Sequence, residues 1–425
     1  MRDDTRRWIE ADKRHAWHPF TPQDEWTHAD HDPLILVRGE GPWLWDSEGR
    51  RYLDGNASIW TNIHGHAHPV INAAIRTQLE QVAHTSYLGF GNPRASELAE
   101  KLTSFFPEQT LERVFFSDDG STAMECAMKM SLQFRMQTGA EDRRAFVAFA
   151  EGYHGDTLGA ASLGGVSRFF ERFRGMGPEV RFVRSLDELR AMPAEEVHAV
   201  VIEPLIQGVN EMRPWPAGML RELRSWSERA GVLLILDEVM TGFGRTGTMF
   251  ACQQEAVIPD FLCVAKGLTG GYLPLAATLT TRRIYEAFGG AADQAFYYGH
   301  SFTANPLGCA AALASLSLFE SEGTLESLPE KIAHLSWRLD ELRRDCPEVV
   351  DVRQCGMVAG IELKAGLGAQ TCVLAREFGL LTRPIRDTVV LMPPLCVEKD
   401  HLDMAVEAIR RAARKAQASV SGGCE

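Results

Sequence analysis

The sequence predicts an α/β protein with a large three-layer domain, built around a mainly parallel sheet, and a smaller α+β domain. Between about residues 110 and 280, helix-like segments separate seven short apolar runs: RVFFS, AFVAF, VRFV, AVVIEP, VLLILD, FLCVA and AATLTT. Continuous rather than alternating hydrophobicity is typical of strands that are covered on both faces of a parallel sheet. The pattern changes beyond about residue 310, and 425 residues leave room for a second domain.

The last part of the chain predicts the smaller domain. Apolar residues recur there at helical spacing, with the strand-like runs GMVAGIEL and VVLMPP between them: Ile332, Leu335, Leu339 and Leu342, then Leu402, Val406 and Ile409. We expect residues 61–310 to form the large domain, residues 311–425 the small domain, and residues 1–60 to join the small domain. The final run, QASVSGGCE, has the composition of a disordered tail.

Charge and cysteine content narrow the classes of function. A formal net charge of −13 disfavours nucleic acid and anionic membranes as partners, since both attract clustered lysine and arginine. Nine cysteines occur singly, without a C-x-x-C pair, as is typical of reduced cytosolic thiols. The N-terminus is charged throughout, and no stretch approaches the ~20 apolar residues of a membrane span. We therefore expect a soluble, cytoplasmic protein that acts on small molecules.

The stretch LLILDEVMTGFGRTG, residues 233–247, allows two interpretations. Its glycines have the G-x-G-x-x-G spacing, but a dinucleotide site needs them directly between strand and helix, with an acid about 20 residues further on. Five residues intervene here, so we expect the glycines to shape a loop. Asp237 and Glu238 instead stand at the carboxyl end of a strand, where open α/β sheets bind ligands. The alternative for these acids is a helix N-cap or a structural ion pair with Arg245.

A lysine ends the next predicted strand, in DFLCVAKGLTGGYLP. Burial disfavours the ammonium form, lowers the pKa and makes the amine nucleophilic, as in lysines that form Schiff bases. An exposed structural lysine is the alternative. A Schiff-base lysine, Lys266, together with an acid that holds a pyridinium nitrogen, Asp237, is the signature of pyridoxal 5′-phosphate chemistry.

The phosphate of that cofactor needs a site, and RVFFSDDGSTAMECAMKMS offers one. A predicted strand runs into Gly120, Ser121 and Thr122, where a helix begins. Free N–H groups and the macrodipole at a helix N-terminus favour a dianion, and the two hydroxyls can add donors. The alternative is an ordinary N-cap, with Glu125 completing a capping box to Thr122.

Tyr153 lies in a glycine-flanked turn after a strand, in AFAEGYHGDTLGA. Its ring can stack on a pyridine ring or pack within the protein, and the neighbouring motifs favour stacking. The segment HGHAHP contains His64, His66 and His68, but no accompanying cysteine or H-E-x-x-H pattern completes a ligand set. We therefore expect hydrogen-bonding histidines and no metal.

Over nearly the whole chain, these motifs resemble the class III, fold-type I aminotransferases that use pyridoxal 5′-phosphate. DDGSTAMECAMKMS resembles their phosphate loop, EGYHGDTLGA their ring-stacking segment, and VVIEPLIQG their strand with an acid, here Glu203. LILDEVMTGFGRTG resembles the strand with the pyridinium acid, and VAKGLTGGYLPLAA the segment of the Schiff-base lysine. GHSFTANPLGCAAALASL resembles a piece that crosses a dimer interface. The resemblance implies a homodimer with shared active sites, in which His300 and Ser301 bind the phosphate of the neighbouring subunit's cofactor.

The ends of the chain are similar to one branch of that family, which converts 8-amino-7-oxononanoate to 7,8-diaminononanoate in biotin synthesis. RHAWHPFTPQ, SIWTNIHGHAHP and LTRPIRDTVVLMPPL carry this similarity. It implies that Arg383 binds the substrate carboxylate, since a guanidinium can donate to a carboxylate bidentately. The residues implied to line the substrate channel are Phe20, Ile59, Trp60, Tyr153 and Gly299.

Two positions depart from that branch. Many members have tyrosine in place of Phe20, and two consecutive tryptophans in place of Ile59 and Trp60. Both departures fall near the amino-donor site, and the donor is S-adenosylmethionine in most members and lysine in a minority. The rival hypotheses are another class III aminotransferase acting on a diamine, an ω-amino acid or ornithine, a 1,2-aminomutase, and a non-catalytic role.

Overall fold

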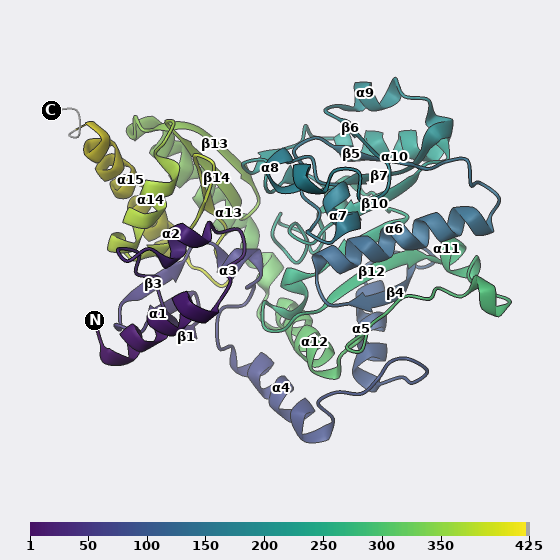
Figure 1. Cartoon of the computed structure of the whole chain (residues 1–425), viewed down its shortest axis with the longest axis horizontal. Helices are drawn as coiled ribbons and strands as arrows, with labels where there is room; N and C mark the ends of the chain where they lie inside the picture. The colour runs from purple at the N-terminus through teal and green to yellow at the C-terminus, as the bar shows by residue number, and fades with distance from the viewer. Residues whose placement is uncertain (422–425) are drawn as a thin grey trace.

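A seven-stranded sheet forms the centre of the larger part of the molecule in the computed structural model, which describes residues 1–421 (Figure 1). The order of its strands is β4-β12-β11-β10-β7-β5-β6. All seven predicted runs form these strands: β4 (Leu111–Ser117), β5 (Ala145–Phe149), β6 (Val180–Val183), β7 (Val197–Ile202), β10 (Leu233–Asp237), β11 (Phe261–Val264) and β12 (Ala276–Thr281).

The sheet is mainly parallel, as predicted. β10 pairs in parallel with β7 and β11, and β5 pairs in parallel with β6 and β7. β12 is antiparallel to both of its neighbours, β11 and β4. The carboxyl ends of six strands therefore meet at one edge of the sheet, which is where such sheets bind ligands.

Both faces of the sheet are buried under helices, because the side chains of each strand alternate between two apolar clusters. In β10, Leu234 and Leu236 belong to one cluster, whereas Leu233 and Ile235 belong to the other. The first cluster includes side chains of α5 (Pro93–Thr103), α10 (Met219–Ala230) and α12 (Pro306–Ser321). The second includes side chains of α6 (Gly120–Gln137), α7 (Leu158–Ser162) and α11 (Arg282–Glu286). The predicted three-layer α/β/α arrangement is confirmed.

The C-terminal part has its own antiparallel sheet, in the order β13-β14-β17-β16. Its elements are β13 (Val349–Cys355), β14 (Val358–Leu363), β16 (Pro384–Ile385), β17 (Thr388–Leu391), α13 (Thr324–Asp345), α14 (Gly368–Ala375) and α15 (Lys399–Ser421). The predicted helical positions lie in α13 and α15, and all except the half-buried Ile332 are buried. The prediction of a disordered tail is wrong for residues 417–421, which continue α15, and residues 422–425 lie outside the described part.

The N-terminal segment lies beside the C-terminal part (Figure 1). It contains α1 (Asp3–His15), α2 (Gln23–Thr27), β1 (Leu36–Glu40), β2 (Trp43–Asp46) and β3 (Arg51–Asp54). β3 pairs in parallel with β15 (Leu380–Leu381), so residues from both ends of the chain share one sheet. This pairing agrees with residues 1–60 joining the small domain, although the boundaries at 60 and 310 stay predictions.

Shorter elements complete the description. They are α3 (Ala57–Trp60), α4 (Pro69–Gln81), α8 (Ser167–Phe170), α9 (Leu186–Arg190), β8 (Ile206–Gln207) and β9 (Arg213–Pro214), with short 3-10 turns between elements. Within residues 1–421, no helix combines the length and the apolar character that crossing a membrane requires.

Truncation in the central strand should destabilise the fold. Leu234 in β10 is fully buried, so Leu234→Ala should lower the free energy of unfolding by about 2–5 kcal/mol through lost burial and a residual cavity. Thermal denaturation should show a clearly lower melting temperature. Met136→Ala in α6, where the side chain is exposed, is the matched control and should leave the melting temperature nearly unchanged. Equal effects of the two substitutions would contradict the assignment of β10 to the core.

Candidate active site

A cavity of about 670 Å³ opens at the carboxyl edge of the large sheet. Loops that follow five of its strands line it, with Asp118 after β4, Tyr153 after β5, Glu203 after β7, Asp237 at the end of β10, and Lys266 after β11. The topology thus gathers residues that are far apart in the sequence, because parallel strands end at one edge.

Lys266 is the lysine that lines this cavity. Burial lowers the pKa of its ammonium group, although the negative charges of Asp237 and Glu203 act in the opposite direction. Its backbone has a left-handed φ of 42°, a strained conformation of the kind that clusters at functional sites. The indole of Trp60 lies 4.9 Å from Nζ, and no carboxylate among residues 1–421 forms an ion pair with it. The amine is therefore available for chemistry inside the cavity.

Asp237 is held by two hydrogen bonds. Oδ1 accepts from the backbone N–H of Val239 at 3.0 Å, and Oδ2 lies 2.7 Å from Nδ1 of His154. Burial alone would lower the pKa of His154, but the hydrogen bond and charge of Asp237 outweigh burial, so the pKa of His154 is raised. Asp237 thus has a buried hydrogen-bond partner, which offsets its removal from water.

That partner is not the one considered from the sequence. Arg245 donates to the carbonyl oxygens of Asn62 and Pro393, each at 2.6 Å, and forms no ion pair with Asp237. Glu238 accepts from the backbone N–H groups of Ala251 and Cys252, at 2.6 and 2.8 Å. Glu238 and the glycine-rich loop are therefore structural, and Asp237 is the acid that lines the cavity.

Glu203 is a second buried acid of the cavity. Its carboxylate accepts from the backbone N–H groups of Tyr153 at 3.2 Å and Gly208 at 2.9 Å. Burial raises the pKa of Glu203 to about 7, against the charge of His154, which lowers it. Because of this raised pKa, a large fraction of Glu203 carries a proton at neutral pH.

The N-terminus of α6 faces the same cavity. Asp119 is the N-cap, and it forms a capping box with Thr122, rather than the box between Thr122 and Glu125 considered from the sequence. Glu125 instead accepts from the N–H groups of Gly159 and Ala160. The first N–H groups of α6, at Gly120 and Ser121, remain for an anion, as is usual at helix N-termini.

The chain packs closely around two glycines near the N-terminus of α6. A Cβ atom on Gly120 would lie 2.5 Å from Val239, and one on Gly155 would lie 2.4 Å from Oγ of Ser121. Oγ of Ser121 accepts from the N–H groups of Asp156 and Thr157 at 3.0 and 2.9 Å. Gly120 and Ser121, which are predicted to bind a phosphate, therefore line the same cavity as Lys266.

Only some of the predicted substrate residues line the cavity. Trp60 and Tyr153 line the cavity, whereas Phe20 and Ile59 are 61% and 45% exposed and do not line it in the single chain. Phe20 approaches it indirectly: its ring contacts Phe169 at 5.4 Å, and Phe169 contacts Tyr153 at 6.2 Å.

The remaining predicted residues lie outside the cavity of the single chain: Gly299, His300, Ser301 and Arg383. His300 lies 3.4 Å from Asp118, which does line it. Burial lowers the pKa of the Arg383 guanidinium, and no carboxylate of residues 1–421 forms an ion pair with it.

Two of the three predicted hydrogen-bonding histidines have side-chain partners, whereas Nε2 of His64 is buried without a hydrogen-bond partner in the described part of the chain. His66 lies 2.9 Å from Asp54, and His68 lies 3.0 Å from Glu322. His64 is buried, and burial lowers its pKa to about 3. Across residues 1–421, no three side chains of the metal-binding types come close enough together to hold an ion.

The family model described as aminotransferase class-III matches residues 26–413. The chain belongs to this family. It is 41% identical to the adenosylmethionine-8-amino-7-oxononanoate aminotransferase of Geobacter sulfurreducens, with 99% of each chain covered. It is 44% identical to the enzyme of the same name from Nitratidesulfovibrio vulgaris, with 96% of this chain and 82% of the other covered.

Solved structures indicate the same family. The adenosylmethionine-8-amino-7-oxononanoate aminotransferase of Methanocaldococcus jannaschii matches with a TM-score of 0.93 and 38% identity, over 97% and 99% of the two chains. A pyridoxal-phosphate-bound amine transaminase from an uncultivated Pseudomonas species matches with a TM-score of 0.88 and 31% identity, over 95% and 99%. The predicted fold and family are confirmed, and this chain is a class III aminotransferase.

The sequence reasoning missed His154 as a site residue. The side chain follows Tyr153 in the loop after β5, and β7 alone separates β5 from β10, which carries Asp237. The sequence feature that could have identified His154 is its position in the loop after a parallel strand. The segment 271–275 was also missed as cavity lining, because four of its residues are glycine, proline or leucine and the hydroxyl of Tyr272 bonds the backbone of Gly65 and His68.

Buried Glu203 should make stability depend on pH. Its raised pKa means that the folded state binds the proton more tightly, so the stabilisation is fully present below an unfolded pKa of about 4.3 and is lost as the pH rises through about 7. Glu203→Gln should therefore reduce the fall in melting temperature between about pH 5 and 8. Part of the slope should persist, because burial also raises the pKa of Glu238 to about 7.

Calorimetric melting across this pH range checks the expectation. Glu320→Gln, which alters an exposed glutamate, is the matched control and should leave the slope as in the unsubstituted protein. The same slope in Glu203→Gln as in the control would show that Glu203 does not titrate as described.

Proposed function

We propose that the protein transfers an amino group to 8-amino-7-oxononanoate, giving 7,8-diaminononanoate in biotin synthesis, with pyridoxal 5′-phosphate as cofactor. The observation that carries this proposal is the placement of Lys266 and Asp237, which both line one cavity of the carboxyl edge. The substrate class is supported by identities of 41% and 44% to relatives that are named for this acceptor, over nearly the full length of this chain.

The residues present fit the proposed cofactor. The α6 N–H groups of Gly120 and Ser121 would hold its phosphate, and Asp237 would hold the ring nitrogen. Tyr153 would contact the ring from the cavity wall. When bound, pyridoxal 5′-phosphate supplies an aldehyde that reacts with amines and a ring that accepts the electron pair released at the substrate carbon.

Each residue then has a defined task. The lowered pKa of Lys266 favours the neutral amine, which can attack a carbonyl and can move a proton to and from the substrate carbon. Asp237 would hold the proton of the ring nitrogen in place, because the contacts to His154 and Val239 fix the position of its carboxyl group. Gly120 and Gly155 would border the phosphate end of the cavity, and Trp60 and Tyr153 would face the substrate.

The donor is proposed to be S-adenosylmethionine, with lysine as the alternative, because Phe20 and Ile59 alter the wall near the donor. We further propose a cytoplasmic homodimer, in which His300 and Ser301 complete the phosphate site of the partner subunit. Their position outside the cavity of their own chain supports this assignment. A class III aminotransferase acting on other amines is the second candidate, supported by transaminase structures at 26–31% identity.

A direct assay tests the acceptor and the donor. Purified protein loaded with pyridoxal 5′-phosphate should form 7,8-diaminononanoate from 8-amino-7-oxononanoate when S-adenosylmethionine or lysine is supplied separately. Lys266→Ala should abolish turnover, because it removes the amine that moves the proton. Absence of product with both donors, from protein that shows cofactor absorbance, would exclude this acceptor and direct the search to other amines.

Arg383 provides a sharper test of the substrate. Arg383→Met should raise KM for 8-amino-7-oxononanoate by about 10- to 100-fold, since it removes a charged hydrogen-bonding partner of the carboxylate. Arg386→Met, in the turn between β16 and β17, is the matched control, because the Arg386 guanidinium already pairs with Glu151 at 2.7 Å. Equal KM values for the two variants would contradict carboxylate binding by Arg383.

A further inference from the structure

Four consecutive residues without glycine form a turn of left-handed helix beside the cavity. Ala57, Ser58, Ile59 and Trp60 have φ values of 43°, 50°, 70° and 68°. Hydrogen bonds close the turn, from Trp60 N to the carbonyl of Asn56 at 2.8 Å and from Thr61 N to that of Ala57 at 2.9 Å. Side chains with a Cβ atom disfavour this conformation, so other contacts must stabilise the turn.

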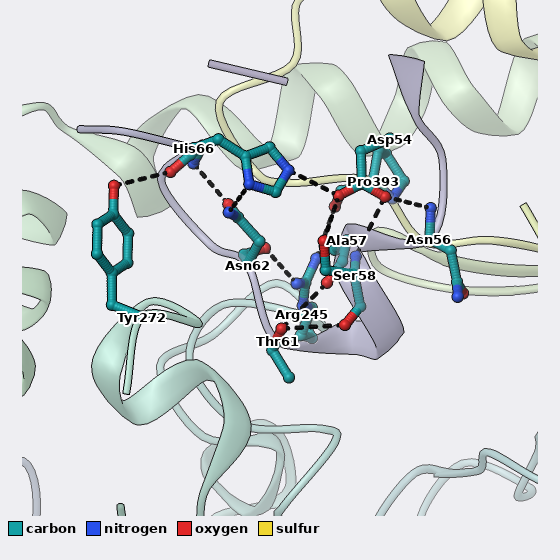
Figure 2. A network of polar contacts seen from close by, with 11 residues as sticks. Asp54, Asn56, Ala57, Ser58, Thr61, Asn62, His66, Arg245, Tyr272 and Pro393 are labelled. Carbon is teal, nitrogen blue, oxygen red and sulfur yellow. Dashed lines mark hydrogen bonds and ion pairs between the residues drawn. The ribbon is translucent and has the colours of Figure 1, made fainter. Parts of the chain in front are cut away.

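The buried carboxylate of Asp54 provides those contacts (Figure 2). Oδ1 accepts from the N–H groups of Asn56 at 3.3 Å and Ser58 at 3.1 Å, and Oδ2 accepts from the Ser58 hydroxyl at 3.0 Å. His66 Nε2 lies 2.9 Å from the same Oδ2. Because the amide of Asn62 donates to Nδ1 of His66, Nε2 carries the proton and donates to Asp54.

Arg245 anchors the far end of the turn. Its guanidinium is 1% exposed and donates to the carbonyls of Asn62 and Pro393 (Figure 2). Arg245 lies in the loop that follows Asp237, and Pro393 follows β17 of the C-terminal part. The turn is thus attached to the loop of the proposed cofactor acid and to the C-terminal sheet at the same time.

The handedness of the turn decides where Trp60 points. The backbone of Trp60 is itself left-handed, so relaxation of the turn to an ordinary conformation would change the direction of its Cα–Cβ bond. In the observed conformation the indole N–H donates to Oδ1 of Asn56 at 2.9 Å, and the ring lies 4.9 Å from Nζ of Lys266. Nζ of Lys266 lies over the face of this ring, in a cation–π geometry.

We propose that Asp54, supported by His66 and Arg245, is a positioning residue that stabilises the left-handed turn and thereby holds the Trp60 indole against Lys266. The proposal rests on the proposed placement of Trp60 in the substrate wall. The left-handed turn places the large side chain of Trp60 at a point that a regular backbone would not reach.

The test compares Ser58→Ala with Ser58→Gly. Both substitutions remove the hydroxyl that donates to Asp54, at an exposed position that is not among the residues lining the cavity. Only glycine takes the left-handed conformation without a steric penalty. Ser58→Ala should lower kcat/KM, whereas Ser58→Gly should retain more of it. Equal losses would overturn the proposal.

A second pair of variants addresses Asp54 itself. Asp54→Asn should lower kcat/KM by about 10- to 100-fold through misplacement of the wall, and the double variant with Ser58→Gly should recover part of the loss. Asp46→Asn is the matched control, because Asp46 is equally buried in the same sheet and bonds Arg50 and Tyr52 instead. A similar loss of activity in Asp46→Asn, or no recovery in the double variant, would show that Asp54 acts only on general stability.

Fluorescence of the full-length chain gives a readout that needs no substrate. Each variant is measured with and without the additional substitution Trp60→Phe. The difference between the two spectra is the emission of the buried Trp60. This emission should shift to longer wavelength in Asp54→Asn and Ser58→Ala, but not in Asp46→Asn. Unshifted emission would overturn the proposal. The emission can shift in these variants even if the unsubstituted protein does not turn over 8-amino-7-oxononanoate. That result would support the positioning role of Asp54 and would exclude the proposed acceptor.

Discussion

The structure of the site depends on one electrostatic constraint, the removal of Lys266 and Asp237 from water. A buried charge is costly unless it is paired or neutralised. Asp237 lies 2.7 Å from its buried partner His154, whereas burial lowers the pKa of Lys266, which has no such partner among the described residues. The same cavity thus contains a carboxyl group held in a fixed position and a lysine amine, which are the two groups that class III transamination requires.

Most of the surrounding architecture supports these two groups. Helix α6 directs N–H groups toward the cavity, and Glu203, which also lines it, is held by two backbone donors. The glycine-rich loop after Asp237 has a different role, because its Arg245 side chain donates to the carbonyl oxygens of two distant segments, at Asn62 and Pro393. This loop therefore connects the chemistry at Asp237 with the left-handed turn that carries Trp60.

Much of this organisation could be predicted from the sequence. The continuous apolar runs gave all seven strands of the large sheet, since burial on both faces removes the need for polar residues. The sequence also indicated Lys266, Asp237 and the start of α6. Each lies at or just after the end of an apolar strand, where a charged residue needs a ligand or a partner. The helical end of the chain at residues 417–421 was missed, since these residues extend α15, whose earlier turns are buried in the core through Leu402, Val406 and Ile409.

The sequence by itself determined the residue types, their order and the strands that carry them. Only the tertiary structure decided the distant partner of Asp237, which is His154 rather than Arg245. Asp119 for Thr122 and Asp54 for Ser58 are local partners, three and four residues away, that the sequence reasoning did not identify. Local sequence fixes where a strand ends and which side chain follows. Hydrogen-bond partners 50 to 180 residues away depend on how the sheets and loops pack, because a carboxylate accepts from whichever donor the fold brings within about 3 Å.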